Sequence, residues 1–259
     1  MNDFTLAKYE ELLDVLINEG YHFIQFKNYL KRPLPQKFVI LRHDVDIKAI
    51  NSLRTAESEF NRGIKGSYYF RVVPASNKPE IITSIASLGH EIGYHYEDLA
   101  ICNGDLEKAY THFCGKLEYF KGYYPVETIC MHGSPVSKYD NRTLWKHYDY
   151  RGLGIIGEPY FDVDFSQVFY LTDTGRCWDG EGYSVRDKVE STFTNNYHST
   201  NDIIAAARDG SLPDKIMITI HPQRWTNNST EWVLELIGQS VKNVIKSALI
   251  KIRKPRLPK

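Results

Sequence analysis

The sequence predicts a single α/β domain with a mainly parallel sheet that is long enough to close into a (β/α) barrel. Helical and strand-like segments alternate along the chain, which is the order expected of βαβ units. No repeat, low-complexity block or Pro/Gly-rich linker divides the 259 residues. Hydrophobic residues make up 42% and charged residues 25% of the chain, as in ordinary globular proteins.

The expected elements follow from hydrophobic periodicity and from end signals. The first helix, at 6–19, places Leu6, Leu13 and Leu16 on one stripe and stops at Gly20. Further helices are expected at 50–61, 79–87, 106–120 and 200–208, with a long last helix from about residue 230. Strands are expected at 38–41, 66–72, 91–96, 128–131 and 216–220, with weaker strands at 154–156 and 168–171.

Charge and cysteine usage exclude several classes of protein. The formal net charge is zero, so the chain has no bulk electrostatic preference for nucleic acid. The four cysteines (Cys102, Cys114, Cys130 and Cys177) form no CxxC pair, which argues against a zinc ribbon or a disulfide framework. We expect a cytoplasmic protein without a transmembrane segment, because neither a secretory leader nor a long apolar run is present. The basic segment 251–259 is expected to be a frayed end, with a membrane-surface or partner contact as the alternative.

The most informative segment is 41–46 (LRHDVD), which follows the apolar run 38–41. Alternation along an extended chain puts Asp44 and Asp46 on one face. Two carboxylates beside a buried strand are costly to desolvate unless a metal or a catalytic division of roles compensates them. Capping of the next helix by two solvated acids explains this fragment alone equally well.

Four further segments decide between these interpretations. Strand ends at five places carry a His or an Asp, namely 43–46 (HDVD), 95–98 (HYED), 132–135 (HGSP), 173–176 (DTGR) and 221–225 (HPQRW). The carboxyl ends of parallel strands meet at one rim, so we expect these side chains to form one site. Histidine and carboxylate suit zinc, manganese, iron or cobalt as ligands. The absence of cysteine from this set of residues weakens the case for a structural zinc.

Three motifs resemble those of the NodB-homology polysaccharide deacetylases, or carbohydrate esterase family 4. They are 41–46 (LRHDVD), 89–95 (GHEIGYH) and 218–222 (ITIHP), and the similarity extends from about residue 38 to 225. The segments 130–135 (CMHGSP) and 171–178 (LTDTGRCW) resemble a divergent branch that is associated with surface-polysaccharide biosynthesis.

This resemblance implies a distorted (β/α) barrel that removes an acetyl group from a sugar with the help of one divalent metal, for which zinc is expected. One domain would span 1–259, with an N-terminal helix at about 5–20, the barrel at about 37–225 and a C-terminal helix and basic tail at about 230–259. By position, Asp44 matches the catalytic base and His221 the general acid. Asp46 and His95 match two metal ligands.

The chain departs from the family at the second metal histidine. That position is Leu99, which cannot bind a metal. We expect His132, at the end of a neighbouring strand, to replace it, with Glu97 and Asp98 as the other candidates. His90 precedes the strand and is expected to be structural.

Five residues are expected to contact the substrate: Asp173, Arg176, Trp178, Arg224 and Trp225. An indole stacks on a sugar ring, and arginine holds carboxylate or phosphate. The expected substrate is an acetylated sugar, either free, nucleotide-linked or lipid-linked. Two alternatives remain open. One is a catalytically inactive barrel that binds saccharide or organises a biosynthetic complex, and the other is a metal hydrolase that acts on an amide or phosphoester outside sugar chemistry.

Overall fold

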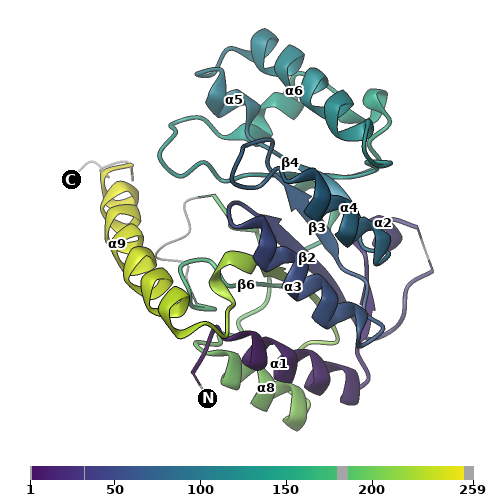
Figure 1. The fold of residues 1–259 in the computed structure, drawn as a ribbon, viewed down its shortest axis with the longest axis vertical. Helices are drawn as coiled ribbons and strands as arrows, with labels where there is room; N and C mark the ends of the chain where they lie inside the picture. The colour runs from purple at the N-terminus through teal and green to yellow at the C-terminus, as the bar shows by residue number, and fades with distance from the viewer. Residues whose placement is uncertain (1, 32, 180–185, 254–259) are drawn as a thin grey trace.

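The computed structural model describes residues 2–31, 33–179 and 186–253, which build one parallel sheet with helices around it (Figure 1). The strand order is β5-β4-β3-β2-β7-β6, and β1 pairs with the first part of β2. The strands are β1 (His22–Ile24), β2 (Phe38–Val45), β3 (Ser67–Phe70), β4 (Glu91–Tyr96), β5 (Ile129–Met131), β6 (Phe169–Thr172) and β7 (Lys215–Ile220).

Helices α1, α3, α4 and α8 lie next to one another around the sheet, with α1 between α8 and α3 (Figure 1). The long helices are α1 (Leu6–Asn18), α3 (Ala49–Phe60), α4 (Pro79–Ser87), α6 (Leu106–Lys121), α8 (Thr200–Asp209) and α9 (Ser229–Arg253). The short ones are α2 (Phe26–Tyr29), α5 (Asp98–Ile101), α7 (Pro159–Asp162), η1 (Asn141–Lys146), η2 (Tyr150–Leu153) and η4 (Pro222–Arg224). A reciprocal capping box between Ser199 and Asp202 starts α8.

The expected α/β fold is confirmed, but the closed barrel is wrong. Within the described ranges β5 and β6 are the two edges of the sheet and do not pair with each other, so the sheet is a curled half-barrel. The strand expected at 154–156 does not form. Gly154 ends η2 at a φ of 76°, and only one bridge, between Thr128 and Gly157, extends the sheet there. The edge that a barrel would have to close is therefore made of loops and 3-10 turns.

Most expected elements are confirmed to within two residues. Strand β2 is longer than expected, because it continues to Val45, and it is buried along its whole length. Arg42, His43 and Asp44 are consequently strand residues rather than loop residues. The sequence did not indicate β1 or the short helices, because segments of three to six residues carry too little periodicity. The predicted basic tail lies largely outside the described residues, which end at residue 253.

Alternation along the strands separates the inner face of the half-barrel into an apolar floor and a polar rim. Ile40, Tyr69, Cys130 and Met217 pack together as part of a buried apolar cluster. The residues two positions after these four are, respectively, Arg42, Arg71, His132 and Thr219. The period of two therefore sends polar side chains to the carboxyl ends of the same strands.

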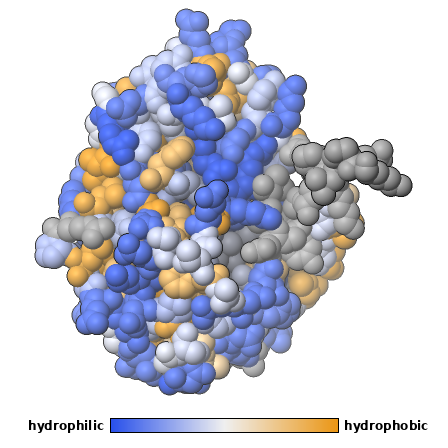
Figure 2. All heavy atoms as spheres, turned by 180° about the vertical axis from the view of Figure 1, so that it is seen from behind, coloured by the Kyte–Doolittle hydropathy of each residue, from blue (hydrophilic) through white to orange (hydrophobic). Residues whose placement is uncertain are grey.

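Helix α9 lies along one side of the molecule, away from most of the sheet (Figure 1). Its large apolar side chains include a group that is exposed: Val233, Leu234, Leu236, Ile237, Val241, Val244 and Ile245. Figure 2 shows apolar atoms at the edge of the molecule on this side. Within the described residues, no helix combines the length and apolar character needed to cross a membrane.

Gly93 lies on the inner face of β4, where no side chain fits. A Cβ there would lie 2.4 Å from the Tyr69 ring and 2.7 Å from the carbonyl oxygen of Thr128. We expect Gly93→Ala to lower the free energy of unfolding by about 2 kcal/mol or more, because the ring and the neighbouring strand must both move. Urea denaturation measures this change.

The matched control is Gly115→Ala on α6, where an added methyl group meets nothing within 4 Å. Alanine in a helix interior is favoured over glycine, so this variant should be neutral or more stable by about 1 kcal/mol. Equal effects of the two substitutions would contradict the steric account of Gly93.

Candidate functional site

The polar rim opens into a cavity of about 260 Å³ at the carboxyl ends of the strands. The structure brings all five residues predicted as catalytic groups or metal ligands to its wall: Asp44, Asp46, His95, His132 and His221. Asp44 is on β2 and His95 on β4, while the other three directly follow strands β2, β5 and β7. The expected convergence of strand ends on one rim is therefore what the structure shows.

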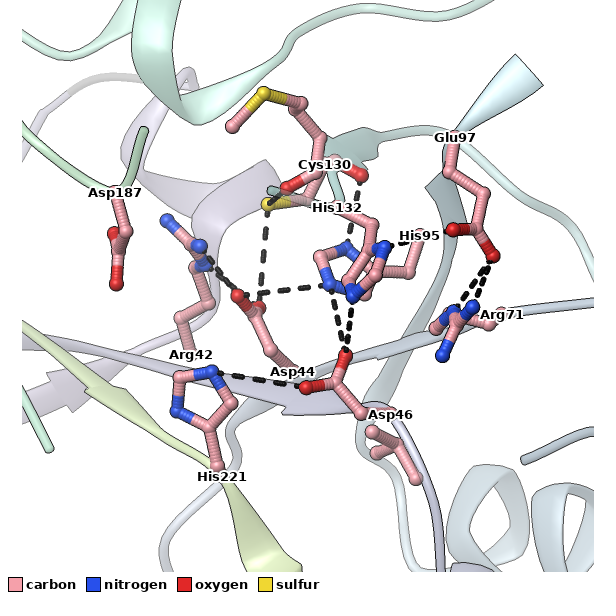
Figure 3. A network of polar contacts seen from close by, with 12 residues as sticks. Arg42, Asp44, Asp46, Arg71, His95, Glu97, Cys130, His132, Asp187 and His221 are labelled. Carbon is pink, nitrogen blue, oxygen red and sulfur yellow. Dashed lines mark hydrogen bonds and ion pairs between the residues drawn. The ribbon is translucent and has the colours of Figure 1, made fainter. Parts of the chain in front are cut away.

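Asp44 is held by a buried arginine. Arg42 Nε and Nη2 donate to Asp44 Oδ1 and Oδ2 at 2.8 and 2.6 Å, and the guanidinium is fully buried (Figure 3). Burial by itself would raise the pKa of Asp44, but Arg42, together with His95 and His221, outweighs burial and lowers that pKa below its ordinary value. Asp44 is therefore a carboxylate at neutral pH.

Two histidine rings face the same oxygen of Asp46 (Figure 3). Its Oδ1 is 3.5 Å from His95 Nε2 and 3.4 Å from His132 Nε2. This oxygen is buried and accepts no hydrogen bond from the described residues. Burial opposes the charged form of Asp46, yet His132, His95 and His221 together lower its pKa well below the ordinary value. A buried anionic oxygen facing two ring nitrogens is a site for a cation.

The two distances from Asp46 Oδ1 to the histidine nitrogens match those between ligands of one divalent metal. Two ligands that each lie about 2.1 Å from one ion in tetrahedral geometry are about 3.4 Å apart. The measured separations of 3.4 and 3.5 Å agree with this value. Asp46, His95 and His132 offer a cradle of one oxygen and two nitrogen donors that could hold a divalent metal, a chemistry that zinc accepts.

Hydrogen bonds on the far side of both rings fix their orientation. His95 Nδ1 donates to the carbonyl oxygen of Cys130 at 3.0 Å. His132 Nδ1 lies 2.9 Å from Glu97 Oε2, and Arg71 pairs with the other oxygen of Glu97. Burial raises the pKa of Glu97, but His132 and Arg71 reverse this and bring it to about 2. These contacts leave each Nε2 directed at Asp46.

A second set of donor atoms lies deeper in the same wall. One atom each of Asp44, His95 and Cys130 lies within 4.8 Å of the others. Asp44 is already paired through both oxygens with Arg42. Burial raises the pKa of the Cys130 thiol well above its ordinary value, so the sulfur is a neutral thiol. The set with Asp46 and His132 is chemically the better cradle.

His221 faces the cavity from the other side of Asp46 (Figure 3), with Nε2 4.0 Å from Asp46 Oδ2. Its Nδ1 lies 2.6 Å from Asp173 Oδ1, and its backbone N–H donates to Asp173 Oδ2. Arg224 and Trp225 Nε1 also donate to this fully buried carboxylate. Asp173 therefore holds the orientation of His221 and leaves Nε2 toward the cavity.

The expected substrate contacts need correction. Asp173 and Trp225 are buried behind His221 and do not line the cavity. Trp178 lies in the apolar core with its indole N–H on Thr200. The Arg176 guanidinium stacks on Trp232 outside the cavity wall. Arg224 is the one member of this predicted set that lines the cavity.

The other residues considered as metal ligands lie elsewhere or have other partners. Leu99 is in the apolar core beside α6. Asp98 accepts from Tyr94 and pairs with His112, away from the cavity. Glu97 holds His132 from behind, as described above. His90 is structural as expected, because its Nδ1 accepts the backbone N–H of Gly66.

The sequence analysis missed several residues of the cavity wall. Asp187 accepts hydrogen bonds from the hydroxyls of Tyr160, Tyr170, Thr172 and Thr174. Its pKa would be raised by burial, but Arg42 and these donors hold it far below the ordinary value. No local motif indicates Asp187, because its hydroxyl partners are spread over two elements and their flanks. Gln223, Glu235, Gln239, Lys242 and Lys246 also line the cavity.

Comparison with known proteins found similarity at the level of solved structures. No protein-family model matches the chain, and no curated protein matches its sequence significantly. A mutant of a CE4 family pseudoenzyme is 13% identical, with a TM-score of 0.39 over 79% of this chain and 62% of that chain. A family 4 carbohydrate esterase from Bacillus anthracis is 12% identical, with a TM-score of 0.38 over 92% of this chain and 91% of that chain.

A mutant of the peptidoglycan deacetylase PdaC from Bacillus subtilis is 14% identical, with a TM-score of 0.38 over 85% of this chain and 94% of that chain. The chain spans less than two thirds of the two pseudoenzyme chains, at 62% and 64% of their lengths. Similarity at this level carries no argument about activity. The function proposed below therefore depends on the geometry of the site.

Glu158 binds the backbone next to the site, and its pKa lies near neutrality. Its carboxylate accepts the backbone N–H groups of Met131, next to His132, and of Tyr160. Burial raises its pKa from 4.5 to about 7, although these N–H groups and Arg42 lower it. A raised pKa means that the folded form holds a proton which the unfolded form releases between pH 4.5 and 7. Stability is therefore lost as pH rises through this window.

We expect Glu158→Gln to remove this pH dependence. Relative to the parent, the variant should gain on the order of 3 kcal/mol in free energy of unfolding between pH 4.5 and 8. At pH 4.5 the free energy of unfolding of the variant should be lower than that of the parent, because a Gln side chain cannot accept both N–H groups. Urea denaturation at several pH values measures the difference, with Glu107→Gln on the surface of α6 as control. Parallel pH profiles for parent and Glu158→Gln would refute the assignment.

Proposed function

We propose that the protein is a metal-dependent hydrolase that removes the acetyl group from an N-acetylated sugar. The observation that carries this proposal is the buried Oδ1 of Asp46, which has no hydrogen-bond donor and lies 3.5 and 3.4 Å from two oriented histidine nitrogens. The resemblance of the three sequence motifs to the polysaccharide deacetylases supports the choice of substrate. A role in surface-glycan biosynthesis stays a prediction from the same resemblance.

Asp46, His95 and His132 would hold the metal, and zinc is the metal that two imidazoles and a carboxylate suit best. A divalent cation in that place supplies a Lewis acid that polarises the acetyl carbonyl. Three protein ligands leave room for the substrate. In this arrangement His132 takes the place of the metal histidine that Leu99 cannot provide.

Asp44 would accept a proton from the attacking water. The ion pair with Arg42 keeps Asp44 deprotonated, and its position on the same face of β2 puts it beside Asp46 at the cavity wall. The low pKa makes Asp44 a weak base, so its position must compensate for its weak proton affinity.

His221 would donate a proton to the departing nitrogen. Asp173 binds the Nδ1 side of the ring, so Nε2 is the atom that faces the cavity. His221 lies on the other side of Asp46 from His95 and His132 (Figure 3). This separation suits a division of roles in which one side chain takes a proton and another returns one across the scissile bond.

A second candidate function is a saccharide-binding barrel without catalytic activity. The pairing of both Asp44 oxygens with Arg42 favours it, because a carboxylate with both oxygens engaged is a poor proton acceptor. Metal content and acetate release distinguish the two candidates.

We expect the purified parent protein to bind one zinc ion per chain, and Asp46→Ala, His95→Ala and His132→Ala each to abolish stoichiometric binding. Loss of one of three ligands removes much of the affinity of such a site. Elemental analysis after dialysis measures the metal content. His198→Ala is the matched control, since this histidine is exposed and lies on the surface.

Cys130→Ala separates the two possible donor sets. We expect this variant to retain the metal, because the neutral thiol lies outside the proposed cradle. Loss of metal in Cys130→Ala with retention in His132→Ala would instead support the set of Asp44, His95 and Cys130. A parent protein that binds no metal after reconstitution would refute the hydrolase.

We expect His221→Ala and Asp44→Asn each to lower kcat for acetate release by about 10²–10⁴-fold, the usual contribution of a general acid or base. Asp173→Asn should lower kcat in the same direction, because it removes the acceptor that orients His221. Metal content should stay at the parent level in all three variants. A kcat that is unchanged in His221→Ala would exclude His221 as the proton donor.

A further inference from the structure

Two cations of the cavity wall form no ion pair with a described carboxylate. Lys242 and Lys246 lie on the face of α9 that lines the cavity, together with Glu235 and Gln239. The Lys246 side chain is partly buried, and Asp46 and Asp187 act on its charge only from beyond ion-pair distance. Burial, with some help from Arg224, lowers the pKa of Lys246 to about 8, although Asp46 and Asp187 raise it. A partly desolvated ammonium group without a close counter-ion is costly to the free protein.

Several guanidinium groups near Lys246 are, in contrast, already engaged by protein groups. Arg42 pairs with Asp44, Arg71 with Glu97, and Arg224 with Asp173, all at ion-pair distance. Arg186 donates to the carbonyl oxygens of the 133–137 loop. Among the described residues of the cavity wall, Lys246 and Lys242 are accordingly the cations that no protein carboxylate holds.

We propose that the substrate carries a phosphate group, and that Lys246 binds this phosphate with Lys242 beside it. This inference rests on the proposed function, because it places an anionic group of the acetylated sugar next to the metal cradle. Lys242 and Lys246 are four residues apart on α9, so their side chains lie on one face of the helix. Helix α9 is thus the element that selects the substrate by charge.

Two ammonium groups on one helix face suit phosphate better than carboxylate. A carboxylate is usually held by the planar fork of an arginine, and the guanidinium groups named above are engaged. Lysines act as point charges and are common partners of phosphate. Asp46 and Asp187 also face the cavity and would repel the phosphate. A divalent metal beside Asp46 would offset the charge of Asp46, and Arg42 lies near Asp187.

Calorimetric titration of the zinc-loaded protein tests this inference with three probes. They are N-acetylglucosamine, N-acetylglucosamine 1-phosphate and UDP-N-acetylglucosamine. We expect both phosphorylated probes to bind at least tenfold more tightly than the neutral sugar, the usual size of a charge-assisted contact. Equal affinity for the two phosphorylated probes would mean that only the phosphate is recognised, whereas tighter binding of the nucleotide-linked probe would identify a nucleotide sugar as the source.

Lys246→Met should remove most of the preference for phosphate, and Lys246→Arg should retain it. Lys108→Met, on the exposed face of α6, is the matched control and should bind like the parent. The zinc content of Lys246→Met should equal that of the parent, which shows that the metal cradle is intact.

Equal affinity of the parent for neutral and phosphorylated sugars would overturn the inference, as would an unchanged preference in Lys246→Met. Failure of the hydrolase has a different signature. A protein that releases no acetate, yet still prefers the phosphorylated probes through Lys246, retains the phosphate subsite and loses only the proposed reaction. Absence of binding for all three probes would overturn the inference.

Discussion

The ion pair between Arg42 and Asp44 is the interaction around which the inner face of the half-barrel is arranged. A fully buried guanidinium is tolerable only with carboxylates close to it, and Asp44 supplies a bidentate contact while Asp187 adds its charge nearby. The pair also keeps Asp44 ionised in a site where burial alone would favour its neutral form. The stability of the inner face and the charge state of Asp44 thus depend on the same two residues.

The two faces of β2 use buried charge in different ways. On the inner face Arg42, Asp44 and Asp46 lead to the cavity. On the outer face His43 pairs with Glu59 at 2.9 Å and stacks on Tyr68, in a region closed to solvent. Both networks leave buried polar atoms without a hydrogen bond: His43 Nδ1 and Glu59 Oε2 in the outer one and Asp46 Oδ1 in the inner one. The two networks differ in access, because the inner one borders the cavity and the outer one is closed to solvent.

The α/β order and most element positions could be predicted because strand and helix periods are local properties of the sequence. Closure of the sheet could not, because it depends on whether β5 and β6 meet, and no residue pattern reports that contact. Asp44, His95 and His221 were predictable from their positions at strand ends. Trp178 and Trp225 were misplaced because an indole has the same local pattern in a core as in a sugar cleft. Lys246 lies on a helix beyond the last motif, where only the tertiary fold shows its surroundings.

The central position of β2 has a consequence for the order in which the chain folds. Strand β7 lies between β2 and β6, yet it is the last of the described strands to be synthesised. Until then the edge of β2 that will pair with β7 exposes unpaired backbone groups next to an apolar floor, and such edges recruit other chains. Pairing between such distant segments is also slow. The nascent chain therefore passes through a stage at which β2, the strand that carries Asp44, exposes an edge that can pair with other chains.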